Sequence, residues 1–150
     1  MQMVGEEFNR FRSLTSQDMP SLGGGGMKFN YGIISQPDAV LDLNITTDQV
    51  LLMFASPVII DKIIVYDVST TLAASLAAGG IYTAASKGGS AVVAAGQVYT
   101  ALTSSIKFLA LTQALPNDLR SEANLYFSLT VAHGAPATAK IVIFGWKVGS

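Results

Sequence analysis

The sequence predicts an all-β fold, an antiparallel β-sandwich or jelly roll preceded by a short N-terminal arm. Seven short segments rich in β-branched and aromatic residues follow one another at close spacing, and Pro, Gly, Asn, Asp and Ser separate them. No long amphipathic helices alternate with these segments, which argues against a parallel α/β sheet. A length of 150 residues fits one domain with one core.

The first element is an N-terminal arm, residues 1–26, which ends in a glycine-rich hinge. Apolar residues recur in the arm at the spacing of one helix face, which predicts a short helix; an extended or frayed terminus is the alternative. Because a helix of about 12 residues is marginal in water, this stripe needs a surface on its own domain or on a neighbouring subunit. The predicted partner-binding residues are Val4, Phe8, Phe11 and Leu14, and the hinge residues are Gly23, Gly24, Gly25 and Gly26.

The β domain, residues 27–150, carries the predicted strands. Residues 124–131 alternate apolar and polar side chains, which is typical of a half-buried antiparallel strand. Residues 59–66 and 141–144 are apolar on both faces, which indicates central strands or strands covered by another chain. A Gly/Pro connection of hairpin length joins the last two strands. The predicted strands are residues 29–34, 39–45, 50–54, 58–68, 106–112, 124–131 and 140–147.

The middle of the chain leaves two interpretations open. Residues 68–86 consist mostly of Ala, Gly, Ser and Thr, a composition too polar for a membrane span. Residues 70–79 fit two helical turns that end at a glycine, and they fit equally well an extended strand packed closely on a neighbour. Between Asp67 and Lys107 the only charged residue is Lys87, which predicts a flat small-residue face for self-assembly.

Charge and composition narrow the function classes. Charged residues make up 13% of the chain, against an average of about 25%, so we expect a partner to cover part of the surface. A net charge of −1 provides no basic field for nucleic acid or for an anionic membrane. The chain has no cysteine, which excludes disulfides, thiolate nucleophiles and Cys-ligated zinc. The acidic N-terminus does not read as a signal peptide.

Motifs that resemble catalytic or ligand sites have simpler interpretations. His133, the only histidine, is expected in an exposed turn, and one imidazole cannot form a multi-histidine metal site. Residues 86–90 contain Lys before two glycines, but the order of a P-loop is wrong, so we expect a tight turn. Asp42, Asn44 and Thr46 lack the glycine and glutamate of a calcium loop and are expected on the polar side of an edge strand. We therefore predict no catalytic residue, no metal site and no cofactor.

Aromatic residues are the remaining candidates for ligand binding. They could stack on sugar rings from one face of a sandwich, although packing in the core or at an interface is the more common use of such residues. The residues concerned are Tyr31, Tyr66, Tyr82, Tyr99, Tyr126 and Trp146.

Three segments resemble a known protein family. Residues 79–89 read Gly-Gly-Ile-Tyr-Thr-Ala-Ala-Ser-Lys-Gly-Gly, residues 125–130 read Leu-Tyr-Phe-Ser-Leu-Thr, and residues 141–145 read Ile-Val-Ile-Phe-Gly. Over about residues 58–145 this pattern resembles small virion structural proteins of tailed bacteriophages. The resemblance implies a jelly-roll-like β-sandwich, strands and turns between residues 70 and 103 with one short helical turn near 97–102, and no catalytic residues. The arm has no counterpart in it.

The resemblance implies a viral protein without enzymatic activity, most plausibly a head decoration or cement protein. Such a subunit covers the seams between shell subunits through many weak contacts that symmetry repeats. We expect a homo-oligomer, with a trimer favoured, that binds the major capsid protein on the surface of the virion after assembly in the host cytoplasm. The alternatives are a tail, baseplate or head-fibre component and a carbohydrate-binding β-sandwich module.

Overall fold

The computed structural model describes residues 29–54 and 57–149. Within these ranges every regular element is a β-strand and none is a helix. The predicted arm and hinge, with Val4, Phe8, Phe11, Leu14, Gly23, Gly24, Gly25 and Gly26, lie outside the described residues. The strands are β1 (Phe29–Ile33), β2 (Ala39–Asp42), β3 (Gln49–Leu52), β4 (Val58–Tyr66), β5 (Ala78–Ala84), β6 (Gly88–Val93), β7 (Phe108–Ala110), β8 (Leu119–Arg120), β9 (Asn124–Val131) and β10 (Thr138–Val148).

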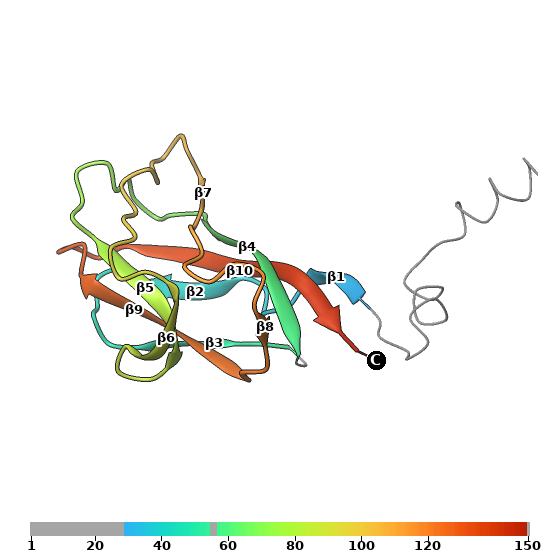
Figure 1. The fold of residues 1–150 in the computed structure, drawn as a ribbon. Helices are drawn as coiled ribbons and strands as arrows, with labels where there is room; N and C mark the ends of the chain where they lie inside the picture. Colours follow the sequence, from blue (N-terminus) through green and yellow to red (C-terminus); the bar gives the residue numbers. More distant parts are fainter. Residues whose placement is uncertain (1–28, 55–56, 150) are drawn as a thin grey trace, which may run out of the picture.

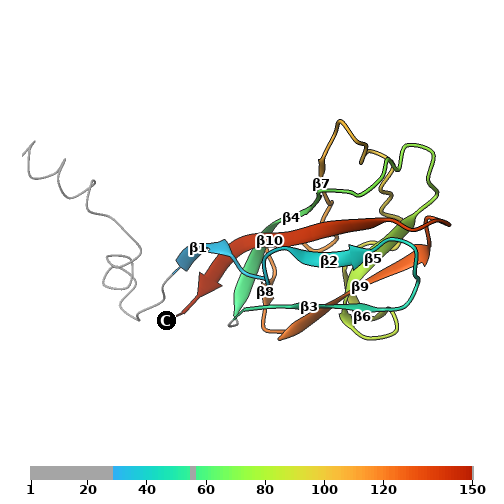
Figure 2. The same cartoon turned by 180° about the vertical axis from the view of Figure 1, so that it is seen from behind.

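The strands form two antiparallel sheets that lie face to face (Figure 1). The strand order in the β10 sheet is β1-β10-β4-β7. β2 pairs with β10 on the same side as β1, further along the strand, and β8 likewise pairs with β4 on the same side as β7 (Figure 2). The β9 sheet has the order β3-β9-β5-β6. The chain crosses between the sheets after β2, β3, β4, β6, β8 and β9, which is the double Greek-key winding of a jelly roll. The predicted jelly-roll-like antiparallel β-sandwich is therefore confirmed.

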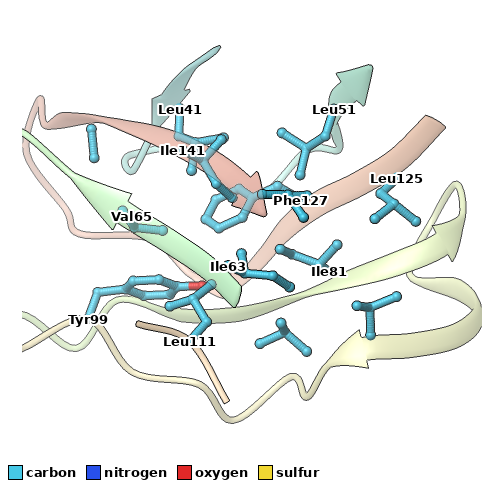
Figure 3. Close-up of a cluster of buried hydrophobic side chains, with 14 of the residues drawn as sticks. Leu41, Leu51, Ile63, Val65, Ile81, Tyr99, Leu111, Leu125, Phe127 and Ile141 are labelled. Atoms are coloured by element: carbon cyan, nitrogen blue, oxygen red, sulfur yellow. The ribbon is translucent and has the colours of Figure 1, made fainter. Parts of the chain in front are cut away.

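One hydrophobic core fills the space between the sheets. Leu41, Ile63 and Ile141 enter it from the β10 sheet, and Ile81 and Phe127 enter it from the β9 sheet (Figure 3). These side chains come from alternate strand positions, so each sheet buries one apolar face as the residue pattern requires.

Tyr99 closes one side of the core from the loop after β6. Its ring meets the edge of the Phe127 ring at a centroid distance of 5.9 Å. Its hydroxyl donates to the Gly79 carbonyl oxygen over 3.0 Å, so the one polar atom carried into the core is satisfied. Burial raises the pKa of Tyr99.

Most predicted strands form near their expected positions. β9 matches the predicted 124–131 segment, and the doubly apolar segments 59–66 and 141–144 lie in β4 and β10, the two central strands of their sheet. Residues 70–79 form no helix: a turn joins Leu72 to Ser75, and β5 begins at Ala78. At residues 97–102 there is a turn closed by the Leu102 N–H and the Tyr99 carbonyl, without a helix.

Small residues in β5 allow close approach between strands. A Cβ placed on Gly80 would lie 2.1 Å from the Val93 carbonyl oxygen of β6, and one on Gly79 would lie 2.3 Å from the Leu129 Cα of β9. These glycines therefore serve contacts inside the β9 sheet rather than a flat assembly face, which was the expected use of this segment.

The expected hairpin between the last two strands is wrong. β9 lies in one sheet and β10 in the other, and residues 132–137 cross between them. Two hydrogen bonds to the turn after β2 hold the crossing loop. The His133 N–H donates to the Leu43 backbone carbonyl over 2.8 Å, and the Gly134 N–H donates to the side-chain Oδ1 of Asn44 over 2.9 Å. β9 and β10 each have an apolar inner face. Both faces are buried because the two strands lie in opposite sheets and face each other across the core.

Gly145 provides a test of this architecture. It sits in β10 beside a bulge in the pairing with β4, and an added Cβ would lie 2.0 Å from the Ile59 carbonyl oxygen. We expect Gly145→Ala to lower the free energy of unfolding by about 3 kcal/mol or more, because backbone must move to admit the methyl group. Gly32→Ala is the matched control, since among the described residues no non-neighbouring atom lies within 4 Å of its added Cβ. Urea denaturation measures both; equal losses would contradict the close approach.

Candidate functional site

The outer face of the β10 sheet carries apolar side chains in all four rows of strands, with Lys62 and Lys140 among them on the two central strands. Directly paired residues share one face of a sheet, so the register with the core-facing residues identifies the outward side chains. One line across the sheet joins Tyr31, Trp146, Ile59 and Leu119. We call this surface the outer apolar face; it comprises Tyr31, Ile33, Val40, Ile59, Ile64, Tyr66, Phe108, Leu119, Val142, Phe144 and Trp146.

Several of these side chains are exposed to an unusual degree. Val40 and Phe108 are each 64% exposed and Leu119 is 59% exposed. Single apolar residues at a surface are ordinary, whereas a contiguous set across a sheet marks an interaction surface. The face therefore has the character of a binding surface rather than of a solvated sheet.

A shallow depression of about 430 Å³ lies on the outer apolar face. Its lining includes Ile64 and Phe144 from the central strands, Ile33 from β1 and Phe108 from β7. Asp38, in the turn between β1 and β2, also lines it. Its apolar lining and open shape suit a protruding apolar side chain of a partner.

Polar groups around the face are bonded to one another. The Tyr66 hydroxyl donates to Asp38 Oδ1, and the Tyr31 hydroxyl donates to Asp61 Oδ2 over 2.8 Å. The bond to Asp38 is the main reason that the pKa of Tyr66 is raised to about 12. The bond to Asp61 likewise raises the pKa of Tyr31. Because these hydroxyls and carboxylates already hydrogen-bond to each other, a docking partner would not leave them buried without a hydrogen bond.

The opposite face, on the β9 sheet, is different. Gly80, Ser128 and Thr130 face outward there, and the β2–β3 loop covers part of it: Ser128 Oγ donates to the Thr46 carbonyl over 3.4 Å. Lys87 Nζ donates to the same carbonyl over 3.2 Å. Val50 and Leu52 of β3 are also exposed on this face, at 52% and 50%. The face therefore mixes apolar and polar side chains, and the outer apolar face, which carries apolar residues in all four rows, is the stronger candidate for binding.

The segment 86–90 forms the predicted tight turn. Ser86 and Lys87 have φ of 59° and 56°, and the Gly88 N–H donates to the Ala85 carbonyl over 3.1 Å. Two central residues with positive φ are typical of a type I′ hairpin turn. The Ser86 N–H donates to the Asp48 carboxylate, and this bond is the main cause of the lowered pKa of Asp48.

His133 is half-buried, so the expectation of an exposed turn residue is wrong. Its Nδ1 lies 2.8 Å from Ser75 Oγ, because the loop that carries it crosses the end of the sandwich. Ser75 is only 5% exposed, and its Oγ accepts the Ala77 N–H over 2.9 Å. This serine–histidine contact joins two loops and presents no accessible nucleophile.

Asp42 and its neighbours lie mostly outside a strand. β2 ends at Asp42, and the Asn44 N–H donates to Asp42 Oδ1 over 2.8 Å, which makes a turn. The expected edge-strand position therefore holds for Asp42 but not for Asn44 or Thr46. Across residues 29–54 and 57–149, no three His, Cys, Asp or Glu side chains gather as metal ligands would.

The aromatic candidates divide between interior and surface. Tyr99 lies in the core, and Tyr82 is buried on the outward side of the β9 sheet, where it pairs directly with Tyr126. Tyr31 and Trp146 meet edge to face on the outer apolar face with ring centroids 4.9 Å apart. Tyr66 shares that face, and Tyr126 faces outward on the β9 sheet. No single platform therefore holds all six aromatic residues.

The residue pattern predicted this surface only in part. The doubly apolar segments in β4 and β10 indicated coverage by another chain, and both contribute to the face. Val40, Phe108 and Leu119 were not singled out. Residues 39–45 and 106–112 were predicted as strands, but only the pairing shows which of their side chains face outward and that Leu119 lies in a strand at all.

Comparison with known proteins supplies no relative. No family model, curated protein or solved structure gives a significant match to this chain. In the described part of the chain, no helix is long and apolar enough to cross a membrane. The candidate site consequently rests on its own geometry.

The bond between Tyr66 and Asp38 predicts a pH dependence. A raised pKa means that the stabilisation by this pair is complete below the ordinary value of 10.0 and is lost as the pH rises through about 12, since tyrosinate has no proton to donate. We expect Asp38→Asn to bring the pKa of Tyr66 down toward its ordinary value. Asparagine tolerates the positive φ of 56° at this position.

Ultraviolet titration of tyrosinate absorbance measures this shift, and Tyr66→Phe identifies the signal of Tyr66 among the five tyrosines. An unchanged titration in Asp38→Asn would show that the carboxylate does not hold the hydroxyl.

Proposed function

We propose that this chain is a non-enzymatic structural subunit of a bacteriophage particle, a capsid decoration or cement protein that bridges subunits of the shell. The outer apolar face is the observation that carries the proposal. It offers a broad surface of exposed apolar and aromatic residues on a rigid sheet, as a docking protein requires.

The sequence resemblance and the jelly-roll winding support the same role. The chain has the winding of a jelly roll, a double-sheet fold that viral capsid and lectin domains use. The low charge content agrees with a subunit whose surface is partly covered in its working state.

On the particle we propose that copies associate with each other, as a trimer around a local three-fold axis, and with the major capsid protein. The outer apolar face and the stripe of Val4, Phe8, Phe11 and Leu14 are the proposed contact surfaces. Closed symmetry makes each weak contact occur several times, so modest single contacts give a firmly held complex.

A carbohydrate-binding module is the second candidate, favoured by the exposed Tyr31 beside Trp146 and the Asp61 carboxylate. Sugar rings stack on aromatic faces, and carboxylates accept their hydroxyl protons. If this candidate is right, glycan-array binding is lost in Tyr31→Ala and in Trp146→Ala. If no glycan binds the parent chain, the module is excluded.

The decoration role predicts the outcome of a binding experiment with phage heads. Phe108→Lys with Leu119→Lys places two charges on the outer apolar face, and we expect cosedimentation with heads to be lost because the ammonium groups would be desolvated. Leu76→Lys with Val98→Lys is the matched control, since it also adds two charges, at side chains that are 79% and 51% exposed and lie outside that face.

A mass-spectrometric inventory of purified particles locates the protein. A copy number in proportion to the shell subunits supports decoration, whereas a few copies per particle place the chain in the tail, baseplate or head fibre.

In the binding experiment, equal binding of all variants to heads would remove the outer apolar face from the mechanism.

A further inference from the structure

We infer that, in the free subunit, the chain's own residues 4–14 dock on the outer apolar face and cover its depression. The inference rests on the proposed role of this face as an interaction surface and is independent of the particle to which the protein belongs. It concerns the state before any partner is bound.

The point of attachment favours this occupant. Phe29 begins β1, which forms the edge row of the β10 sheet (Figure 1), so the arm is joined covalently to that edge. Rows of a sheet lie about 4.8 Å apart. The depression between β1 and β7 is therefore on the order of 10 Å across the rows from the β1 edge, and Phe29 lies about 13 Å along the strand from Ile33, which lines it. The distance from Phe29 to the depression is on the order of 15 Å.

The length of the connecting chain suits this short distance. Residues 15–28 separate Leu14 from β1, and the segment includes the four-glycine hinge. A flexible chain of that length has a root-mean-square span of about 20 Å. Such a tether holds the stripe at an effective concentration on the order of millimolar. At micromolar protein concentration the chain's own arm therefore outcompetes the arm of a second copy.

The surfaces also match in chemistry. The stripe presents two phenylalanines, Phe8 and Phe11, and the depression is lined by Ile33, Ile64 and Phe108. Lys62 is exposed on the same face, opposite Phe144 in the ladder, and none of the ion pairs among the described residues includes it. Glu7 precedes Phe8 and supplies a carboxylate beside the stripe.

This docking would shield the face until a better partner displaces the arm. An uncovered apolar face promotes non-specific association. Intramolecular cover keeps the free subunit dispersed despite its low charge, and displacement releases both apolar surfaces together.

Trp146 reports directly on the cover, because it is the chain's only tryptophan and lies on the outer apolar face. We expect Phe8→Asp with Phe11→Asp, in the full chain, to shift its emission to longer wavelength and to increase quenching by acrylamide. Asn9→Asp with Ser13→Asp is the matched control, since it adds the same charge on the opposite side of the predicted helix. Equal quenching in the parent chain and both variants would overturn the inference.

A distance measurement separates the chain's own arm from that of a neighbour. The chain has no cysteine, so Ser16→Cys with Ala110→Cys carries two spin labels, one on the arm and one on the outer apolar face. We expect a short, narrow distance by electron paramagnetic resonance that persists when excess unlabelled chain is added. A distance lost on dilution would show exchange between copies, and a broad one would show no docking; either result overturns the inference. Neither measurement involves a phage particle, so the proposed function can fail separately.

Discussion

The structure depends on the pairing of β4 with β10, two strands that are apolar on both faces. On the inner side their residues, such as Ile63 and Ile143, form the floor of the core. On the outer side the same ladder presents Ile64, Phe144 and Trp146. A strand apolar on both faces needs cover on both. Within the described residues the β9 sheet covers one face, and the other face becomes the candidate binding surface, so fold and function follow from one pairing.

Close approach of backbones makes this pairing possible. Gly145 lies where β10 passes the Ile59 carbonyl of β4, at the bulge that keeps Trp146 outward and Ile60 inward. Gly79 and Gly80 likewise allow the backbones of neighbouring strands to approach closely in the β9 sheet. The small residues in the middle of the chain are thus mainly structural, and the low charge of that segment reflects packing between strands as well as any contact with a partner.

An exposed apolar sheet face carries a risk of non-specific association, which the proposed docking of the arm would reduce. A face large enough to hold a partner is also large enough to attract the wrong one. The docking that we propose for the arm, which is attached at the edge of the same sheet through Phe29, would address both requirements. It would cover the face when the subunit is free and add contact area when the subunit is bound. In the pairs Tyr66–Asp38 and Tyr31–Asp61 the hydroxyls are already hydrogen-bonded, so a docked partner would not leave them unpaired.

Local residue patterns predicted the all-β class, the span of β9 and the central place of β4 and β10, because alternation and double-sided apolarity follow directly from strand geometry. They did not predict that β9 and β10 belong to different sheets, since a loop of hairpin length fits either connection. Nor did they predict the strand β5, because the need for glycine at positions 79 and 80 comes from the close approach of the neighbouring strands. The outer apolar face, with Val40, Phe108 and Leu119 from three separate edge strands, arises from long-range pairing: distant segments become one surface only when the register places them side by side.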